Sequence, residues 1–127
     1  PDRVAAIKAR FKLPVMKVIK VRDAADIGRA RDYESVADRL MFDPAPPKDL
    51  KGAMPGGNAV SFDWTLLRGF TSRLPWMLAG GLNTGNLAEA VRLSGASAVD
   101  VSSGVEDRPG EKSPSKIKAF LELSRSL

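Results

Sequence analysis

Hydrophobic positions along the chain alternate between helical spacing and short apolar runs. Val4, Ile7 and Phe11 share one face of a helix expected over residues 3–11. The β-branched run at residues 15–21 is short and predicts a strand. The alternation continues with helices expected over 23–33, 64–73, 83–94 and from 114 onward, and with strands expected over 39–43, 76–79 and 98–101.

Polar residues that favour helix N-termini precede the later helices. Asp23, Asp63 and Asn83 each stand before an expected helix as a candidate N-cap. Ser113 followed by Pro114 gives an N-cap with proline at the first helical position. These signals support the helix starts that the apolar spacing indicates.

The order of elements is one helix followed by four strand–helix units, which predicts a parallel α/β sheet with right-handed crossovers. A complete (β/α)8 barrel needs about 250 residues, and compact members have about 200. We therefore expect the 127 residues to form about half of such a barrel, within a single domain over residues 1–127. A small, open, doubly wound sheet is the alternative, and either architecture places its active face at the carboxyl ends of the strands.

The residue types that the chain lacks exclude several kinds of chemistry. The chain has no cysteine and no histidine, which excludes disulfides, thiolate catalysis and the commonest metal ligand. No apolar run is long enough for a membrane span, and residues 1–3 lack a signal-like core or an initiating Met. We expect a cytoplasmic protein that does not start at its natural first residue.

The net charge of +5 raises the question of an anionic partner. The cations are scattered over several expected helices, and no aromatic platform or nucleic-acid motif accompanies them. Solvated helix faces are the favoured interpretation, ahead of steering of an anionic substrate and of nucleic-acid binding. The scattered residues are Arg3, Lys8, Arg10, Lys12, Arg29, Arg31, Lys112, Lys116 and Lys118.

Two aspartates lie within or at the end of expected apolar strands. Asp43 ends the strand Leu40-Met41-Phe42, a position that suits a general acid, although a loop or cap aspartate fits equally well. Asp100 lies inside an apolar strand and shares a face with Ser102. It is a candidate site residue, or else a buried carboxylate that accepts hydrogen bonds from nearby backbone N–H groups.

Small residues follow two successive strands. Gly80-Gly81 and Ser102-Ser103-Gly104 each precede a helix and are expected to lie side by side, which would make a phosphate cradle from backbone N–H groups and hydroxyls. In the long connection between Pro44 and Ser61, Gly56, Gly57 and Asn58 form either a simple turn or part of a mobile lid over the same site.

These segments together resemble the phosphoribosylanthranilate isomerase family over essentially the whole chain. The resemblance lies in their order and spacing, and the run Asp100-Val101-Ser102-Ser103-Gly104-Val105-Glu106 is its most specific part. The other matching segments are Phe42-Asp43, Pro55-Gly56-Gly57-Asn58, Phe62-Asp63-Trp64 and Trp76-Met77-Leu78-Ala79-Gly80-Gly81-Leu82-Asn83.

The resemblance implies a TIM-barrel enzyme of which this chain covers about strands five to eight. It implies an Amadori rearrangement of phosphoribosylanthranilate without metal or cofactor, in tryptophan biosynthesis. Asp43 matches the family's general acid, and Asp100 matches an aspartate that lines the substrate pocket. Gly80, Gly81, Ser102 and Ser103 match its phosphate-binding turns. Asp63 matches a helix cap.

The chain departs from the family's pattern in three ways. Ala79 stands where serine is common, and Ala59 stands where a glycine often completes the mobile loop. The family's general base is a cysteine in a Lys-Ile-Cys-Gly strand, and an arginine from the same half binds the anthranilate carboxylate; neither has a match here. We therefore expect the chain alone to be inactive. We also expect it to self-associate or to pair with a missing N-terminal half, because its outer strands would otherwise be bare edges.

Two other functions remain open at this point. The chain could be a non-catalytic half-barrel module that binds phosphate or associates with itself. Another phosphate-binding barrel such as indole glycerol phosphate synthase is the third possibility, but the catalytic lysines and glutamate of that family have no convincing match.

Overall fold

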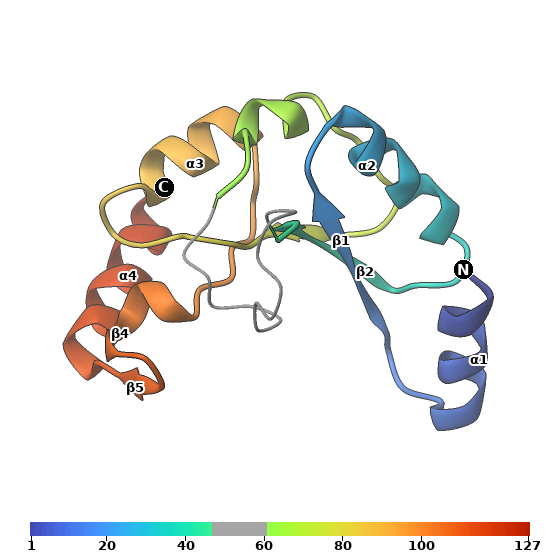
Figure 1. Ribbon diagram of the computed structural model, residues 1–127, viewed down its shortest axis with the longest axis horizontal. Helices are drawn as coiled ribbons and strands as arrows, with labels where there is room; N and C mark the ends of the chain where they lie inside the picture. The colour runs from blue at the N-terminus through green and yellow to red at the C-terminus, as the bar shows by residue number, and fades with distance from the viewer. Residues whose placement is uncertain (47–60) are drawn as a thin grey trace.

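The computed structural model describes residues 1–46 and 61–127 of the chain. The helices lie along the outer side of an arch, with α1 at one end and α4 at the other (Figure 1). The α-helices are α1 (Asp2–Phe11), α2 (Ala24–Gly28), α3 (Leu87–Ser94) and α4 (Pro114–Ser126), and the 3-10 helices are η1 (Arg29–Tyr33), η2 (Trp64–Leu67) and η3 (Ser103–Val105). The strands are β1 (Met16–Val21), β2 (Arg39–Pro44), β3 (Trp76–Leu78), β4 (Glu106–Arg108) and β5 (Glu111–Lys112).

The main sheet has the order β1-β2-β3, and both of its strand pairs are parallel. The register sets Lys20 of β1 opposite Asp43 of β2, and Phe42 of β2 opposite Leu78 of β3. The first three expected strands and their parallel arrangement are thereby confirmed. Because parallel strands end at the same edge, the segments that follow β1, β2 and β3 lie together.

The fourth expected strand, over residues 98–101, is reduced to a single parallel bridge between Leu78 and Val99. The N–H of Leu78 donates to the carbonyl of Ala98 (3.0 Å), and the N–H of Asp100 donates to the carbonyl of Leu78 (2.8 Å). β3 itself ends at Leu78, so it offers few backbone partners beyond this point. The segment lies where the sequence predicts it, but it pairs over a shorter length.

The core is built on the inner side chains of the sheet. Leu40, Phe42 and Leu78 are fully buried. Phe42 makes edge-to-face contacts with Phe70 and Trp76, with ring centroids 5.1 and 5.6 Å apart. Each such contact contributes about 0.5–1.5 kcal/mol beyond the burial of area. This aromatic cluster fixes the end of β2 just before Asp43.

The first two helices begin where the sequence predicts, and only the second is shorter than expected as an α-helix. Asp23 caps α2, because its carboxylate accepts the N–H groups of Ala25 (2.9 Å) and Asp26 (3.2 Å). The α-helix ends at Gly28, and the chain continues to Tyr33 as a 3-10 helix. The helix α1 forms as expected, yet none of its residues is buried.

The helix expected over residues 64–73 is wrong in its length. Asp63 is confirmed as an N-cap, since its side chain accepts the N–H of Thr65 at 3.0 Å. Only the 3-10 turn η2 follows, and it ends at Leu67. Gly69 has φ of 72°, a conformation that stops a helix. The chain then turns so that Phe70 joins the aromatic cluster.

The predicted start of α3 at Asn83 is also wrong. Asn83 instead forms a turn in which its side chain accepts the N–H of Gly85 at 2.8 Å, and the helix begins at Leu87. The predicted buried face is confirmed, because Leu87, Ala90 and Ser94 are all buried.

The last helix begins at Pro114, as expected, and Phe120 on its apolar face is buried. Ile117 and Leu121 on that face are 36% and 46% exposed. The antiparallel hairpin of β4 and β5, which lies before α4, was not expected from the sequence. Among the described residues, no helix combines the length and the hydropathy needed to cross a bilayer.

Candidate active site

Asp43 stands at the carboxyl edge of the main sheet. It follows the fully buried Phe42 and precedes Pro44, the last residue of β2. Its side chain is 19% exposed, and its Oδ2 atom forms an ion pair with Nζ of Lys20. The buried strand therefore holds the carboxylate at the rim of the sheet, with one side open to solvent.

The partner of Asp43 was missed in the sequence. Lys20 reads as one residue of an apolar strand, and its role appears only when β1 and β2 are aligned. A signal was nevertheless available, because parallel strands that both end in polar residues bring those residues to one edge. Lys20 adds a positive charge within contact of the candidate acid.

The first glycine turn packs directly against this aspartate. Gly80 has φ of 93° and Gly81 has φ of 65°, conformations that favour glycine at both positions. A Cβ atom on Gly80 would overlap the ring of Pro44 and would lie 3.1 Å from Oδ1 of Asp43. The Asn86 side chain donates to the carbonyl of Gly81 at 2.8 Å, which fixes the turn.

The two glycine N–H groups of this turn, those of Gly80 and Gly81, have no backbone partner within the described part of the chain. Backbone N–H groups that converge beside a sheet edge are suited to bind an anion. The turn thus provides donors close to the carboxylate of Asp43.

The second turn lies against the first. A Cβ atom on Gly104 would overlap the carbonyl oxygen of Leu82 and would lie 3.1 Å from Cβ of Asn83. Gly104 belongs to η3, which begins directly after Ser102. The structure thus brings Gly104, which follows Ser102-Ser103, against Leu82 and Asn83, which follow Gly80-Gly81.

The second turn is held by the β4–β5 hairpin. Nζ of Lys112 donates to the carbonyl oxygen of Ser102 (3.0 Å), to Oγ of Ser102 (3.2 Å) and to Oε1 of Glu106 (2.6 Å). The hydrogen bond from Lys112 is the main cause that holds the pKa of Glu106 below its usual value. Sequence reasoning treated Lys112 only as one of the scattered cations.

The structure contradicts one of the two interpretations of Asp100. The residue is exposed, so the alternative of a buried carboxylate is wrong. Its N–H pairs with Leu78, so the backbone is fixed next to β3, while the side chain is open to solvent. The backbone bond places Asp100 at the edge where Asp43 and the two turns lie.

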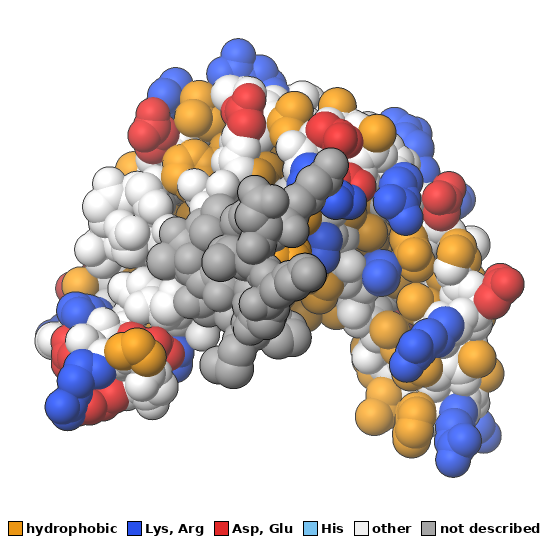
Figure 2. Space-filling model, viewed as in Figure 1, with side chains coloured by type: hydrophobic (Ala, Val, Ile, Leu, Met, Phe, Trp, Pro, Cys, Tyr) orange, Lys and Arg blue, Asp and Glu red, His pale blue; other side chains and the backbone are white. Residues whose placement is uncertain are grey.

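The remaining candidates lie outside the described residues. Gly56, Gly57 and Asn58, with the neighbouring Ala59, fall within residues 47–60. Over the part of the chain that the structure describes, no three carboxylates gather into a group that could hold a metal ion. Figure 2 shows Lys and Arg side chains spread over the visible face and interleaved with acidic ones, rather than gathered in a single patch.

The geometry combines one carboxylate that can exchange a proton with two adjacent turns that present N–H and hydroxyl groups. This arrangement suits a small phosphorylated substrate, whose phosphate is held by the turns while another part of the molecule meets Asp43. The donors lie at the carboxyl edge of a parallel sheet, where α/β proteins bind their ligands.

Comparison with known proteins gives matches over almost the whole chain. A family model described as "N-(5'phosphoribosyl)anthranilate (PRA) isomerase" matches residues 2–123. The curated N-(5'-phosphoribosyl)anthranilate isomerase of Rhodospirillum centenum is 59% identical over 127 residues, which are 100% of this chain and 59% of that protein. The protein of the same name from Paramagnetospirillum magneticum is 60% identical over 98% of this chain and 57% of its own length.

Solved structures agree with these matches. Phosphoribosyl anthranilate isomerase from Thermotoga maritima has a TM-score of 0.76 and 32% identity, over 100% of this chain and 58% of that chain. A second structure shows such an isomerase in complex with reduced 1-(o-carboxyphenylamino)-1-deoxyribulose 5-phosphate. It has a TM-score of 0.74 and 30% identity, and the match covers 100% of this chain and 56% of that chain. The chain thus has their TIM-barrel-like α/β fold and spans less than two thirds of the length of these relatives.

Proposed function

The chain belongs to the N-(5'-phosphoribosyl)anthranilate isomerase family, and on that premise we propose that it supplies the general acid and the phosphate-binding turns of such an isomerase. The reaction is the Amadori rearrangement of N-(5'-phosphoribosyl)anthranilate to 1-(o-carboxyphenylamino)-1-deoxyribulose 5-phosphate in tryptophan biosynthesis. We expect it to take place in the cytoplasm and to need no metal or cofactor.

The observation that carries the proposal is the contact between the carboxylate and the first turn. Asp43 lies beside Gly80, and the segment that follows Gly80 lies against Gly104. A substrate whose phosphate lies on the two turns would extend its ribose toward Asp43. Asp43 and the phosphate-binding turns follow neighbouring strands, so the pairing of these strands sets the distance between them.

In this mechanism Asp43 donates its proton to the ribose ring oxygen. The C1′–oxygen bond breaks, the ring opens, and the anilino nitrogen forms a Schiff base with C1′. A base then removes the proton from C2′, which gives an enolamine that rearranges to the ketone. Lys20 is placed to hold the carboxylate of Asp43 in position between turnovers.

The phosphate is assigned to the two turns. Gly80 and Gly81 offer backbone N–H groups, and Ser102 and Ser103 offer hydroxyls as well. We assign Asp100 to the wall of the substrate pocket, because its exposed side chain stands at the same edge. Its role is to shape the pocket, not to transfer a proton.

The base comes, in this proposal, from residues outside these 127. The chain has no cysteine and no histidine, and Asp100 is not assigned to the C2′ proton. A segment with a Lys-Ile-Cys-Gly strand would supply a thiolate and would also pair with an outer strand of the sheet. The alternative partner is a second copy of this chain, in which case the module binds phosphate without catalysis.

Two variants test the assignment of acid and cradle separately, in the enzyme that carries this chain. Asp43→Asn should lower kcat by at least about 10²-fold, the lower range for a positioned general acid. Gly81→Leu should raise KM more than it lowers kcat, because the phosphate is remote from the reacting carbons. Turnover is followed as the loss of phosphoribosylanthranilate fluorescence.

Gly69→Leu is the matched control for the second variant. Gly69 also has positive φ (72°), and a Cβ atom there would meet no neighbouring atom within 4 Å. The backbone strain is then similar, but the position lies outside the turns. Near-normal turnover in Asp43→Asn would remove the acid role, and an equal KM for the Gly81 and Gly69 variants would remove the cradle.

A further inference from the structure

The β4–β5 hairpin places one ammonium group on the second turn. Nζ of Lys112 lies 3.0 Å from the carbonyl oxygen and 3.2 Å from Oγ of Ser102, and 2.6 Å from Oε1 of Glu106. The mechanism above assigns no task to Lys112. Two of these three contacts reach Ser102, the residue that begins the turn, and the third reaches Glu106 of the hairpin.

The chemistry of the two groups fixes the direction of their hydrogen bond. An ammonium group has three protons and no acceptor, so Oγ of Ser102 must accept from Lys112. The hydroxyl proton of Ser102 is then directed away from Lys112 and remains available as a donor. A phosphate oxygen is an acceptor only, so it needs a hydroxyl in this state.

The charge of Lys112 is already neutralised, which argues against direct binding of the anion. Glu106, whose side chain is 15% exposed, pairs with the ammonium at 2.6 Å. The same carboxylate accepts the N–H of Gly110 at 3.2 Å, and these contacts hold the pKa of Glu106 below its usual value, with the Lys112 bond as the larger cause. The effect of Lys112 on an anion must therefore pass through Ser102.

The hairpin is also fixed to the rest of the chain. Nζ of Lys116 donates to the carbonyl of Glu106 at 2.6 Å and pairs with Asp107 at 2.9 Å. The N–H of Ser113 donates to the carbonyl of Val105 at 2.8 Å. Lys112 is thus presented from a supported strand rather than from a free loop.

We propose that Lys112 is a positioning residue, which fixes the Ser102 turn and orients the Ser102 hydroxyl so that it donates to the substrate phosphate. The inference rests on the proposed function, in which Ser102 belongs to the phosphate cradle. It adds a determinant of phosphate affinity that lies ten residues after Ser102 and does not touch the substrate.

The test uses the enzyme that carries this chain, with Lys112→Met, Ser102→Ala and the double variant. Inorganic phosphate binding is measured by calorimetry, and KM and kcat are measured by the fluorescence assay. We expect Lys112→Met to weaken phosphate binding and to raise KM by about tenfold, the effect of one hydrogen bond to a charged group, with kcat within about twofold. The double variant should lose less affinity than the two single variants lose together, because both changes act on the Ser102 hydroxyl.

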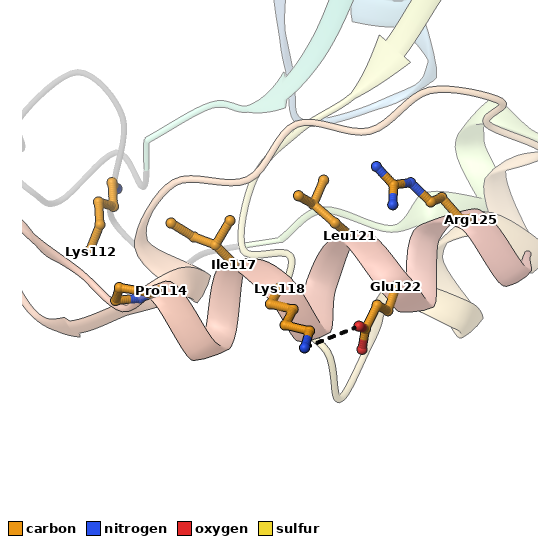
Figure 3. A pocket seen from close by; sticks show the side chains of 7 residues that line it. All are labelled: Lys112, Pro114, Ile117, Lys118, Leu121, Glu122 and Arg125. Carbon is orange, nitrogen blue, oxygen red and sulfur yellow. Dashed lines mark ion pairs between the residues drawn. The ribbon is translucent and has the colours of Figure 1, made fainter.

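Two further variants separate positioning from general damage. Lys112→Arg keeps the charge and the donors and should restore most of the affinity. Lys118→Met is the matched control, because Lys118 lies on α4 and its ion-pair partner among the described residues is Glu122 at 3.9 Å, not a residue of the second turn (Figure 3). It should behave as the unaltered enzyme. If Lys112→Met does not fold, Lys112→Gln takes its place.

The outcomes distinguish this inference from the proposed function. Unaltered phosphate affinity in Lys112→Met overturns the inference, and so does a double variant weaker than Ser102→Ala by the full effect of Lys112→Met. If the unaltered enzyme does not bind phosphate, or if Ser102→Ala has no effect on affinity, the phosphate does not bind at the Ser102 turn. Both the proposed cradle and the role of Lys112 are then wrong.

Discussion

Lys20 and Asp43 occupy paired positions on β1 and β2, and their side chains form an ion pair at the carboxyl edge of the sheet. Lys20 is 43% exposed and Asp43 is 19% exposed. An ion pair with this exposure contributes at most about 1 kcal/mol to stability. Its importance in this account lies in the orientation of the candidate acid.

Lys20→Met is therefore predicted to affect turnover more than stability. The free energy of unfolding should change by less than about 1 kcal/mol, whereas kcat should fall by roughly tenfold because the carboxylate loses its fixed position. Lys17→Met on the same strand is the control, since Lys17 lies over the ring of Tyr33 and not beside Asp43. Equal kcat in the two variants would contradict the orienting role.

A second prediction concerns the contact between the two turns. Gly104→Ala should lower the free energy of unfolding by about 1–3 kcal/mol, because the added Cβ would overlap the carbonyl oxygen of Leu82. Gly28→Ala is the opposite case: Gly28 has helical φ (−57°) and open space around it, so alanine should stabilise by about 0.5–1 kcal/mol. Urea denaturation measures the free energy of unfolding of both variants, which should fall for Gly104→Ala and rise for Gly28→Ala.

A third prediction concerns pH. The backbone N–H of Arg22 donates to the Asp26 carboxylate at 3.0 Å and is the main cause that holds the pKa of Asp26 below its usual value of 3.8. A lowered folded pKa contributes stability above pH about 4, and this stability is lost as pH falls through the folded pKa. Asp26→Asn should therefore be less stable than the unaltered protein at neutral pH, and its stability should fall less below pH about 4.

The control for this pH effect is Asp32→Asn on the exposed surface of η1. It changes the net charge by the same amount and should keep the acid dependence of the unaltered protein. Thermal unfolding between pH 3 and 7 distinguishes the variants. Parallel curves for Asp26→Asn and the unaltered protein would show that Asp26 does not carry this dependence.

The strands could be predicted because their signal is local. Residues 15–21, 39–43 and 76–79 are short apolar runs bounded by turn residues, and each becomes a parallel strand of the main sheet. The helix expected over 64–73 failed for a reason that the spacing of apolar residues does not contain. Phe70 leaves the helical path to pack on Phe42, so a tertiary contact overrides the local pattern.

The candidate site likewise combines residues with a local sequence signal and residues that only the tertiary structure reveals. Asp43 and the two turns are visible in the sequence because they follow apolar strands. Lys20 and Lys112 are not visible, because their significance depends on the strand register and on a hairpin of short, highly charged strands. Charged β-strands of two or three residues carry no hydrophobic alternation, so the hairpin leaves little trace in the sequence pattern.

We propose that this chain provides the acid of the isomerase and that the base comes from residues outside these 127. The direct measurement is the loss of phosphoribosylanthranilate fluorescence with the 127-residue chain alone, and after mixing it with a separately expressed segment that contains a Lys-Ile-Cys-Gly strand. We predict no turnover above background for the chain alone, turnover for the mixture, and loss of that turnover when the chain carries Asp43→Asn. Robust turnover by the chain alone would show that the base lies within these 127 residues, and undiminished turnover of the mixture with Asp43→Asn would show that Asp43 is not the acid.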